Sequence, residues 1–124
     1  MQLQQDSNPA GYVVRRVEAG TIEVNDRSLA SSFIVYPSGL IEDWPPLDCP
    51  SLEPGHLEQA LSLAPEVVLL GSGPVQRFPS QAVMAACLTR GVGIEVMDNA
   101  AAARTYNVLA AEGRSVVAAF LLPG

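Results

Sequence analysis

The chain has 124 residues, of which 48% are apolar and 16% charged, and it carries a net charge of −6. We expect a single domain over residues 1–124, which at this length buries roughly two-thirds of the surface of its unfolded chain. The negative charge and the lack of a basic cluster argue against nucleic-acid binding. The longest apolar run has about seven residues, against roughly 20 for a membrane-spanning helix, so we expect no membrane span.

Cys49 and Cys87 stand in unrelated contexts, and neither belongs to a CxxC or Cys/His pattern, so the sequence predicts no zinc site. The two could form a disulfide, but we prefer two reduced thiols in a cytosolic protein. The N-terminus has no basic or apolar signal region, which favours a soluble, cytoplasmic protein. Residues 1–11 are polar and contain Pro9 and Gly11, and we interpret them as a flexible tail.

Four segments of the N-terminal half have β-strand composition. Tyr12–Glu18 and Thr21–Val24 flank Ala19-Gly20 and predict a hairpin. Leu29–Tyr36 predicts a third strand, and Leu40–Trp44 a short fourth strand that ends at Pro45. We expect these four strands to form an antiparallel meander.

A helix is expected next, because apolar residues recur with helical spacing between residues 57 and 64. It begins near Ser51 or Glu53 and ends at Pro65.

The C-terminal half predicts a βαβαβ unit. Its strands are the apolar runs 67–70, 94–97 and 116–122. The first run is apolar on both faces and suits a central strand, whereas the second alternates and suits a less central one. The first helix has Pro79 in its first turn and Gly91 at its end. The second is capped by Asp98 or Asn99 and ends at Gly113. The fold class is therefore α/β.

Two of the strand exits carry polar or glycine residues that could meet at one edge of the sheet. Gly71, Ser72 and Gly73 follow the first strand, and Asp98 follows the second. Glycines at such a place let backbone N–H groups approach an anion. Pro74 removes a donor, however, and neither a GxGxxG nor a P-loop pattern is present. A tight strand exit, and a plain helix cap for Asp98, are the structural alternatives.

The last helix and its end add a second polar group. Its members are Arg104, Thr105, Tyr106, Asn107, Glu112 and Arg114. Among alanines, such residues lie on a helix only if they are solvated or satisfy one another. Glu112 opposes the helix dipole, which pairing with Arg114 or Arg104 would offset. We expect these residues and the two strand exits to form a ligand or partner site.

The spacing supports no catalytic set. Ser72, His56 and Asp98 can be written as a triad, but triads are recognised by geometry, and His56 follows Gly55 at a polar helix start where a solvated histidine is expected. We predict no metal and no cofactor.

Several motifs together resemble a widespread domain family of unknown function in bacteria and archaea. It includes the mitochondrial assembly factor for respiratory complex I and an adipogenesis-associated animal protein. The matching segments are Gly20–Asn25, Trp44–Pro46, Gly71–Gly73, Ile94–Asp98, Ala103–Leu109 and Glu112–Arg114. The resemblance implies a three-layer fold with a mixed sheet and no established enzymatic activity. Ser72 stands where members often have Thr.

This resemblance favours a non-catalytic protein-interaction or assembly module that acts through an unidentified protein partner. The alternative is a protein that binds a small anionic molecule, or an enzyme that acts on one, at the strand exits, with Arg104 as the counter-charge. The sequence does not determine the oligomeric state.

Overall fold

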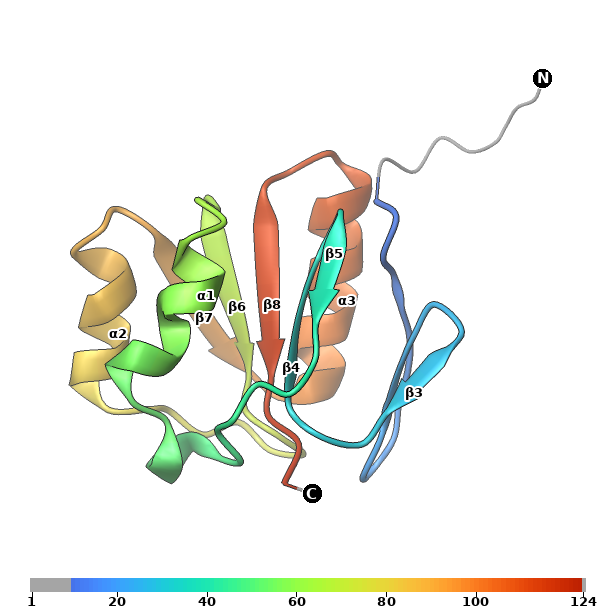
Figure 1. Cartoon of the computed structure of the whole chain (residues 1–124), viewed down its shortest axis with the longest axis horizontal. Helices are drawn as coiled ribbons and strands as arrows, with labels where there is room; N and C mark the ends of the chain where they lie inside the picture. Colours follow the sequence, from blue (N-terminus) through green and yellow to red (C-terminus); the bar gives the residue numbers. More distant parts are fainter. Residues whose placement is uncertain (1–9, 124) are drawn as a thin grey trace.

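A computed structural model describes residues 10–123 and arranges them in three layers around a five-stranded mixed sheet (Figure 1). The strand order is β5-β4-β8-β6-β7. These strands are β4 Phe33–Tyr36, β5 Gly39–Ile41, β6 Val67–Gly71, β7 Gly93–Met97 and β8 Val116–Phe120. A separate antiparallel sheet contains β1 Val14–Val17, β2 Ile22–Val24 and β3 Arg27–Leu29. The fold class is α/β, as the sequence predicted.

The predicted tail lies mostly outside the described residues, which include only Ala10 and Gly11 of it. Gly11 donates its N–H to the Pro37 carbonyl at 2.8 Å, so the chain is attached to the fold from this residue onward.

The predicted βαβαβ unit is present in the C-terminal half. β6 lies between β7 and β8 and pairs in parallel with both. β7 is an edge strand with alternating burial, which explains why its sequence alternates while that of β6 does not. β8 is buried along its whole length, because its other edge pairs with β4 and both of its faces are covered.

Helices cover both faces of this sheet. Helix α2 (Gln81–Leu88) packs on one face with a short helical segment made of η2 (Cys49–Ser51), η3 (Pro54–Leu57) and α1 (Glu58–Leu61). Helix α3 (Asn99–Ala111) and the small sheet cover the other face. In Figure 1 the first group lies on the left and the second on the right.

The helix ends follow the predicted capping chemistry with one exception. Glu53 precedes η3, and Gly91 has a φ of +74°, as a left-handed cap requires. The placement of Pro79 in the first turn of α2 was wrong. The cap of α2 is Ser80, whose hydroxyl accepts the Val83 N–H at 3.3 Å, so Pro79 precedes the helix.

Of the strand predicted over Leu29–Tyr36, only Leu29 belongs to the small sheet, as the last residue of β3, and Phe33–Tyr36 is β4 of the main sheet. The predicted strand Leu40–Trp44 is β5, Gly39–Ile41, also in the main sheet, so the meander has three strands rather than four. The chain leaves the small sheet after Leu29 and enters the main sheet at Phe33. Ser32 marks the change, because its buried hydroxyl accepts the Leu122 N–H at 2.9 Å and its carbonyl accepts the Trp44 N–H. These bonds hold the start of β4 against the end of β8, where β4 and β5 extend the main sheet as a hairpin.

Two phenylalanines form the centre of the layer beneath the small sheet and α3. Phe33 of β4 and Phe120 of β8 are fully buried, and their rings stack with centroids 5.1 Å apart. Stacked aromatic pairs contribute beyond their buried area. They also join the N-terminal and C-terminal halves of the chain.

Replacing this contact should destabilise the whole domain. Phe120→Ala removes a fully buried ring and leaves a cavity, which should lower the free energy of unfolding by about 3–5 kcal/mol. Phe78→Ala is the matched control, because Phe78 is exposed, and should change it by less than about 0.5 kcal/mol. Urea denaturation followed by circular dichroism measures both. Similar losses in the two variants would contradict the stacking argument.

Candidate functional site

The two strand exits lie at the same edge of the sheet. β6 and β7 are parallel neighbours in register from Val67 to Gly71, and the Ser72 N–H continues the ladder by donating to the Met97 carbonyl at 2.9 Å. Gly71, Ser72 and Gly73 are therefore adjacent to Asp98. Gly73 has a φ of +108°, a conformation that glycine adopts without strain, and it turns the chain away from the strand.

The Ser72 hydroxyl is buried and makes three hydrogen-bond contacts. Its oxygen lies 2.7 Å from the Val75 carbonyl oxygen and 3.2 Å from that of Met97, and it accepts the Arg77 N–H at 3.0 Å. Its hydrogen bonds thus hold the loop that follows β6 and link it to the end of β7. Ser72 therefore shapes this loop, and it also borders a hollow together with Gly73, Pro74 and Arg77.

Asn99 is the central residue of this edge, although its sequence context predicted only a possible helix cap. Its side-chain oxygen accepts the Gly73 N–H at 3.0 Å, and its side-chain amide donates to the Leu121 carbonyl at 3.0 Å. Its backbone N–H donates to the Gly73 carbonyl at 2.8 Å. A Cβ on Gly71 would lie 2.4 Å from the Asn99 Oδ1, so glycine is needed there. One buried amide therefore joins the exits of β6, β7 and β8.

Asp98 is the N-cap of α3, which decides between the two caps that the sequence allowed. Its carboxylate accepts the Ala101 N–H at 2.8 Å, satisfying one of the free donors of the first turn.

The four polar residues from Arg104 to Asn107 point in different directions from α3. Tyr106 is fully buried and donates its hydroxyl to the Tyr12 carbonyl at 2.8 Å, and desolvation raises its pKa. The Thr105 hydroxyl lies 3.5 Å from the Met97 sulfur. Arg104 is exposed. Tyr106 therefore supports the fold from inside, while Arg104 is available at the surface.

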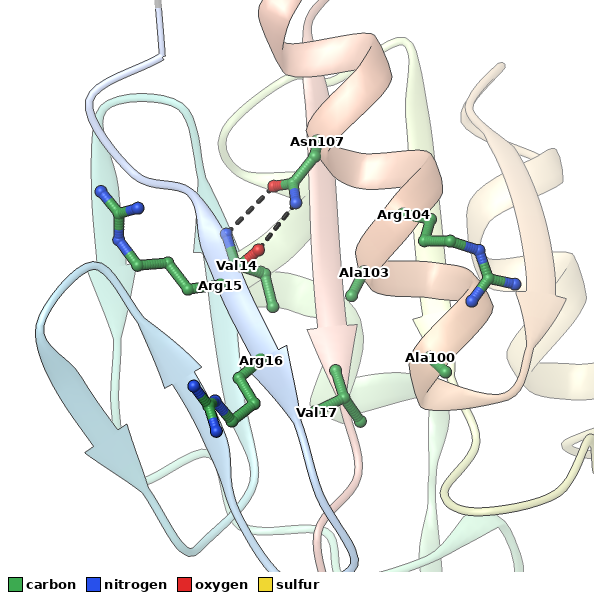
Figure 2. A pocket seen from close by; sticks show the side chains of 8 residues that line it. All are labelled: Val14, Arg15, Arg16, Val17, Ala100, Ala103, Arg104 and Asn107. Atoms are coloured by element: carbon green, nitrogen blue, oxygen red, sulfur yellow. Dashed lines mark hydrogen bonds between the residues drawn. The ribbon is translucent and has the colours of Figure 1, made fainter.

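Asn107 pairs with the outer edge of β1. Its side-chain oxygen accepts the Val14 N–H at 3.0 Å, and its amide donates to the Val14 carbonyl at 2.7 Å (Figure 2). The side chain thus takes the place of a neighbouring strand residue. This pair attaches the small sheet to α3.

Glu112 and Arg114 lie at the opposite end of α3 from Asp98. The Arg114 Nε is 3.1 Å from a Glu66 carboxylate oxygen, and its Nη1 is 3.9 Å from a carboxylate oxygen of Glu112. All three side chains are solvent-exposed, so these pairs contribute little to stability. The structure does not bring Glu112 and Arg114 to the strand exits.

His56 takes part in a separate structural arrangement. Its Nδ1 accepts the Glu53 N–H at 2.9 Å, and its carbonyl accepts the Trp44 indole N–H at 2.8 Å. No hydrogen bond among the described residues joins His56 to Ser72 or Asp98. Over residues 10–123, no group of three or more metal-ligating side chains is found.

Cys49 and Cys87 are buried and not joined to each other, consistent with the preferred reduced thiols. Burial raises the pKa of both thiols, which keeps them protonated. The Cys49 thiol lies 3.3 Å from the Arg77 carbonyl, so it helps to hold the loop after β6.

This loop displays large apolar side chains that sequence reasoning did not identify. Phe78 is 66% exposed, Val75 51%, and Leu47 of the neighbouring segment 53%. A hollow of about 290 Å³ lies between the loop and that segment, and Leu47, Pro74 and Arg77 line it. We call Leu47, Val75 and Phe78 the loop surface. No hydrophobic periodicity marks it, because it has no regular secondary structure.

A groove of about 280 Å³ runs between β1 and α3 (Figure 2). We call it the β1–α3 groove. Its lining residues are Val14, Arg15, Arg16, Val17, Ala100, Ala103, Arg104 and Asn107. Of the predicted site residues, only Arg104 and Asn107 line it.

No helix in the described part of the chain has the length and apolar character needed to span a membrane.

Comparison with known proteins places this fold in a family. The family described as "Protein of unknown function (DUF498/DUF598)" matches residues 14–121, and the chain belongs to it. A 13 kDa major membrane protein of Francisella tularensis subsp. holarctica is 26% identical over 117 residues, which cover 94% of this chain and 95% of that protein.

Solved structures agree with this assignment. The solution structure of a Xanthomonas campestris protein is 48% identical, with a TM-score of 0.84, covering 100% of this chain and 94% of that one. A Bordetella pertussis protein described as a Mth938-like domain is 34% identical, with a TM-score of 0.81 and the same coverage of both chains. The family resemblance expected from the sequence is confirmed.

Removing the Asn99 amide should loosen the strand exits. Asn99→Ala leaves the Gly73 N–H and the Leu121 carbonyl without their partner in a buried place, which should cost about 2–4 kcal/mol of unfolding free energy. Asp98→Ala, one residue away, removes only a helix cap and should cost about 1 kcal/mol. Denaturant titration compares the two. An Asn99→Ala loss no larger than that of Asp98→Ala would contradict the bridging role.

Proposed function

We propose that this protein is a non-catalytic protein-interaction module and that the loop surface contacts its partner. The observation that carries the proposal is the exposure of Phe78 and Val75 on a well-anchored loop, with the exposed Leu47 on the neighbouring segment. Exposed apolar side chains are ordinary when scattered, but aromatic and aliphatic residues gathered on one loop region are typical of interaction sites.

The anchoring of the loop supports this function. Three contacts hold its backbone from inside. They are the Ser72 hydroxyl bonds, the Gln76 amide donating to the Val96 carbonyl at 3.0 Å, and the Cys49 thiol at the Arg77 carbonyl. A loop ordered before binding loses less conformational entropy when a partner docks. The apolar side chains are therefore presented at a defined position.

The family resemblance supports an assembly role in particular. The resembled family includes an assembly factor for respiratory complex I, which acts through protein contacts. The Francisella relative is named a major membrane protein, which suits a partner found at a membrane. The proposed protein is therefore a cytoplasmic module that contacts a partner at a membrane.

The loop surface can be tested by quantitative pull-down at native expression. Phe78→Ser should remove most of the recovery of a specific protein, because it deletes the most exposed aromatic contact. Leu88→Ser is the matched control and should leave recovery unchanged, since Leu88 is 59% exposed but lies at the far end of α2 from this loop. Circular dichroism should show both variants folded.

Two outcomes would contradict the proposal. One is that no stable protein partner is recovered, or that both variants recover it equally. The other is Phe78-dependent binding to lipid vesicles without any protein partner, which would make the loop surface a membrane contact. Analytical ultracentrifugation of the purified chain identifies a second copy as the partner if the association depends on Phe78.

A further inference from the structure

The β1–α3 groove has a chemistry different from that of the loop surface. Its floor is apolar, formed by Val14, Val17, Ala100 and Ala103, and its other lining residues are Asn107 and three arginines. The alanines of α3 leave the space open where larger side chains would fill it. The groove continues into a hollow of about 200 Å³ that also borders Val17 and Ala100.

The charges along the groove are unusual for this chain. All seven basic residues are arginines, set against thirteen carboxylates. Arg27, Arg90 and Arg114 pair with glutamates elsewhere, and Arg16 has Glu18 and Glu23 at 3.6 and 3.7 Å. Arg15 and Arg104 form no ion pair with any described carboxylate. In an acidic protein, two uncompensated guanidinium groups beside one groove make a local site for an anion.

The two arginines stand on opposite walls. Figure 2 shows Arg15 extending from β1 and Arg104 from α3, with their guanidinium groups directed away from each other. Both side chains are exposed, so rotation toward the groove breaks no hydrogen bond or ion pair with another described residue. Guanidinium groups recognise carboxylates through two parallel hydrogen bonds.

The backbone of β1 adds a hydrogen-bonding pair inside the groove. A β-bulge lies between Val14 and Arg16, and Glu18 donates to the Thr21 carbonyl at 2.9 Å. Because paired residues alternate along an antiparallel ladder, the N–H and C=O of Val17 point away from β2, toward α3. Asn107 satisfies the corresponding groups of Val14, but no described residue bonds to those of Val17.

We propose that the β1–α3 groove binds a small organic carboxylate with an apolar body. The apolar floor takes the body, Arg104 and Arg15 bind the carboxylate, and the Val17 backbone offers a further donor. Its volume suits a ligand smaller than a drug-sized molecule. This site shares no residue with the loop surface. A failure of either binding test therefore leaves the other proposal unaffected.

The test is a titration of the ¹⁵N-labelled full chain, followed by amide chemical shifts. Hexanoate is the probe, hexanamide keeps the body without the charge, and acetate keeps the charge without the body. Hexanoate should shift the amides of residues 14–17 and 100–107 with an apparent Kd at least tenfold lower than that of hexanamide or of acetate. Raising the salt concentration should weaken its binding.

Matched variants locate the site. Arg104→Gln and Ala100→Leu should each weaken hexanoate binding at least tenfold, the first by removing charge and the second by filling the groove at an exposed helical position. Arg90→Gln and Ala85→Leu should leave it unchanged, because both positions are exposed and belong to α2 or the turn that follows it, on the opposite face of the sheet. Equal binding of hexanamide, no hexanoate-dependent shifts at these residues, or shifts insensitive to Arg104→Gln would overturn the proposal. So would binding of an acidic peptide but not of hexanoate.

Discussion

The carboxamide of Asn99 is the contact on which the arrangement of the strand exits depends. It accepts the Gly73 N–H and donates to the Leu121 carbonyl, and the backbone of the same residue donates to the Gly73 carbonyl. Three parallel strands end at this residue, and none of these groups is exposed to water. A buried amide with both ends satisfied stabilises, whereas a half-satisfied one would cost free energy. The close fit also explains why Gly71 cannot carry a side chain.

Helix α3 supports the small sheet in the same manner, through side chains that bond to backbone. Tyr106 bonds to the segment that leads into β1, and Asn107 bonds to β1 itself. Tyr106 is fully buried, whereas Asn107 is half-buried and also lines the groove. β1 is thereby held beside α3 without being part of the main sheet. The space between them remains as the β1–α3 groove because Ala100 and Ala103 are small.

The two surfaces proposed for binding differ in chemistry and position. The loop surface presents apolar side chains on an anchored loop after β6, and the groove presents arginines above an apolar floor. A hollow bordered by Gly73, Pro74 and Ala100 lies between them. Both surfaces depend on the Asn99 contact, since that residue holds the start of the loop and the first turn of α3 together.

Local sequence patterns determined the secondary structure and fold class of the C-terminal half. The hydrophobic alternation of β7, the continuous apolar run of β6, and the caps at Asp98 and Gly91 each depend on nearby residues, so the βαβαβ unit, the α/β class and the family resemblance could be predicted. The division of residues 29–36 between two sheets could not, because it depends on bonds from Ser32 to Leu122 and Trp44, distant in the chain. Likewise, only the tertiary structure decided that Tyr106 is buried, that Asn107 bonds to β1, and that Glu112 lies at the opposite end of α3 from the strand exits. The same holds for Arg15 and Arg104 bordering one groove. The reason is physical: spacing along a helix gives the relative directions of its side chains, but the element packed against each face decides which become buried.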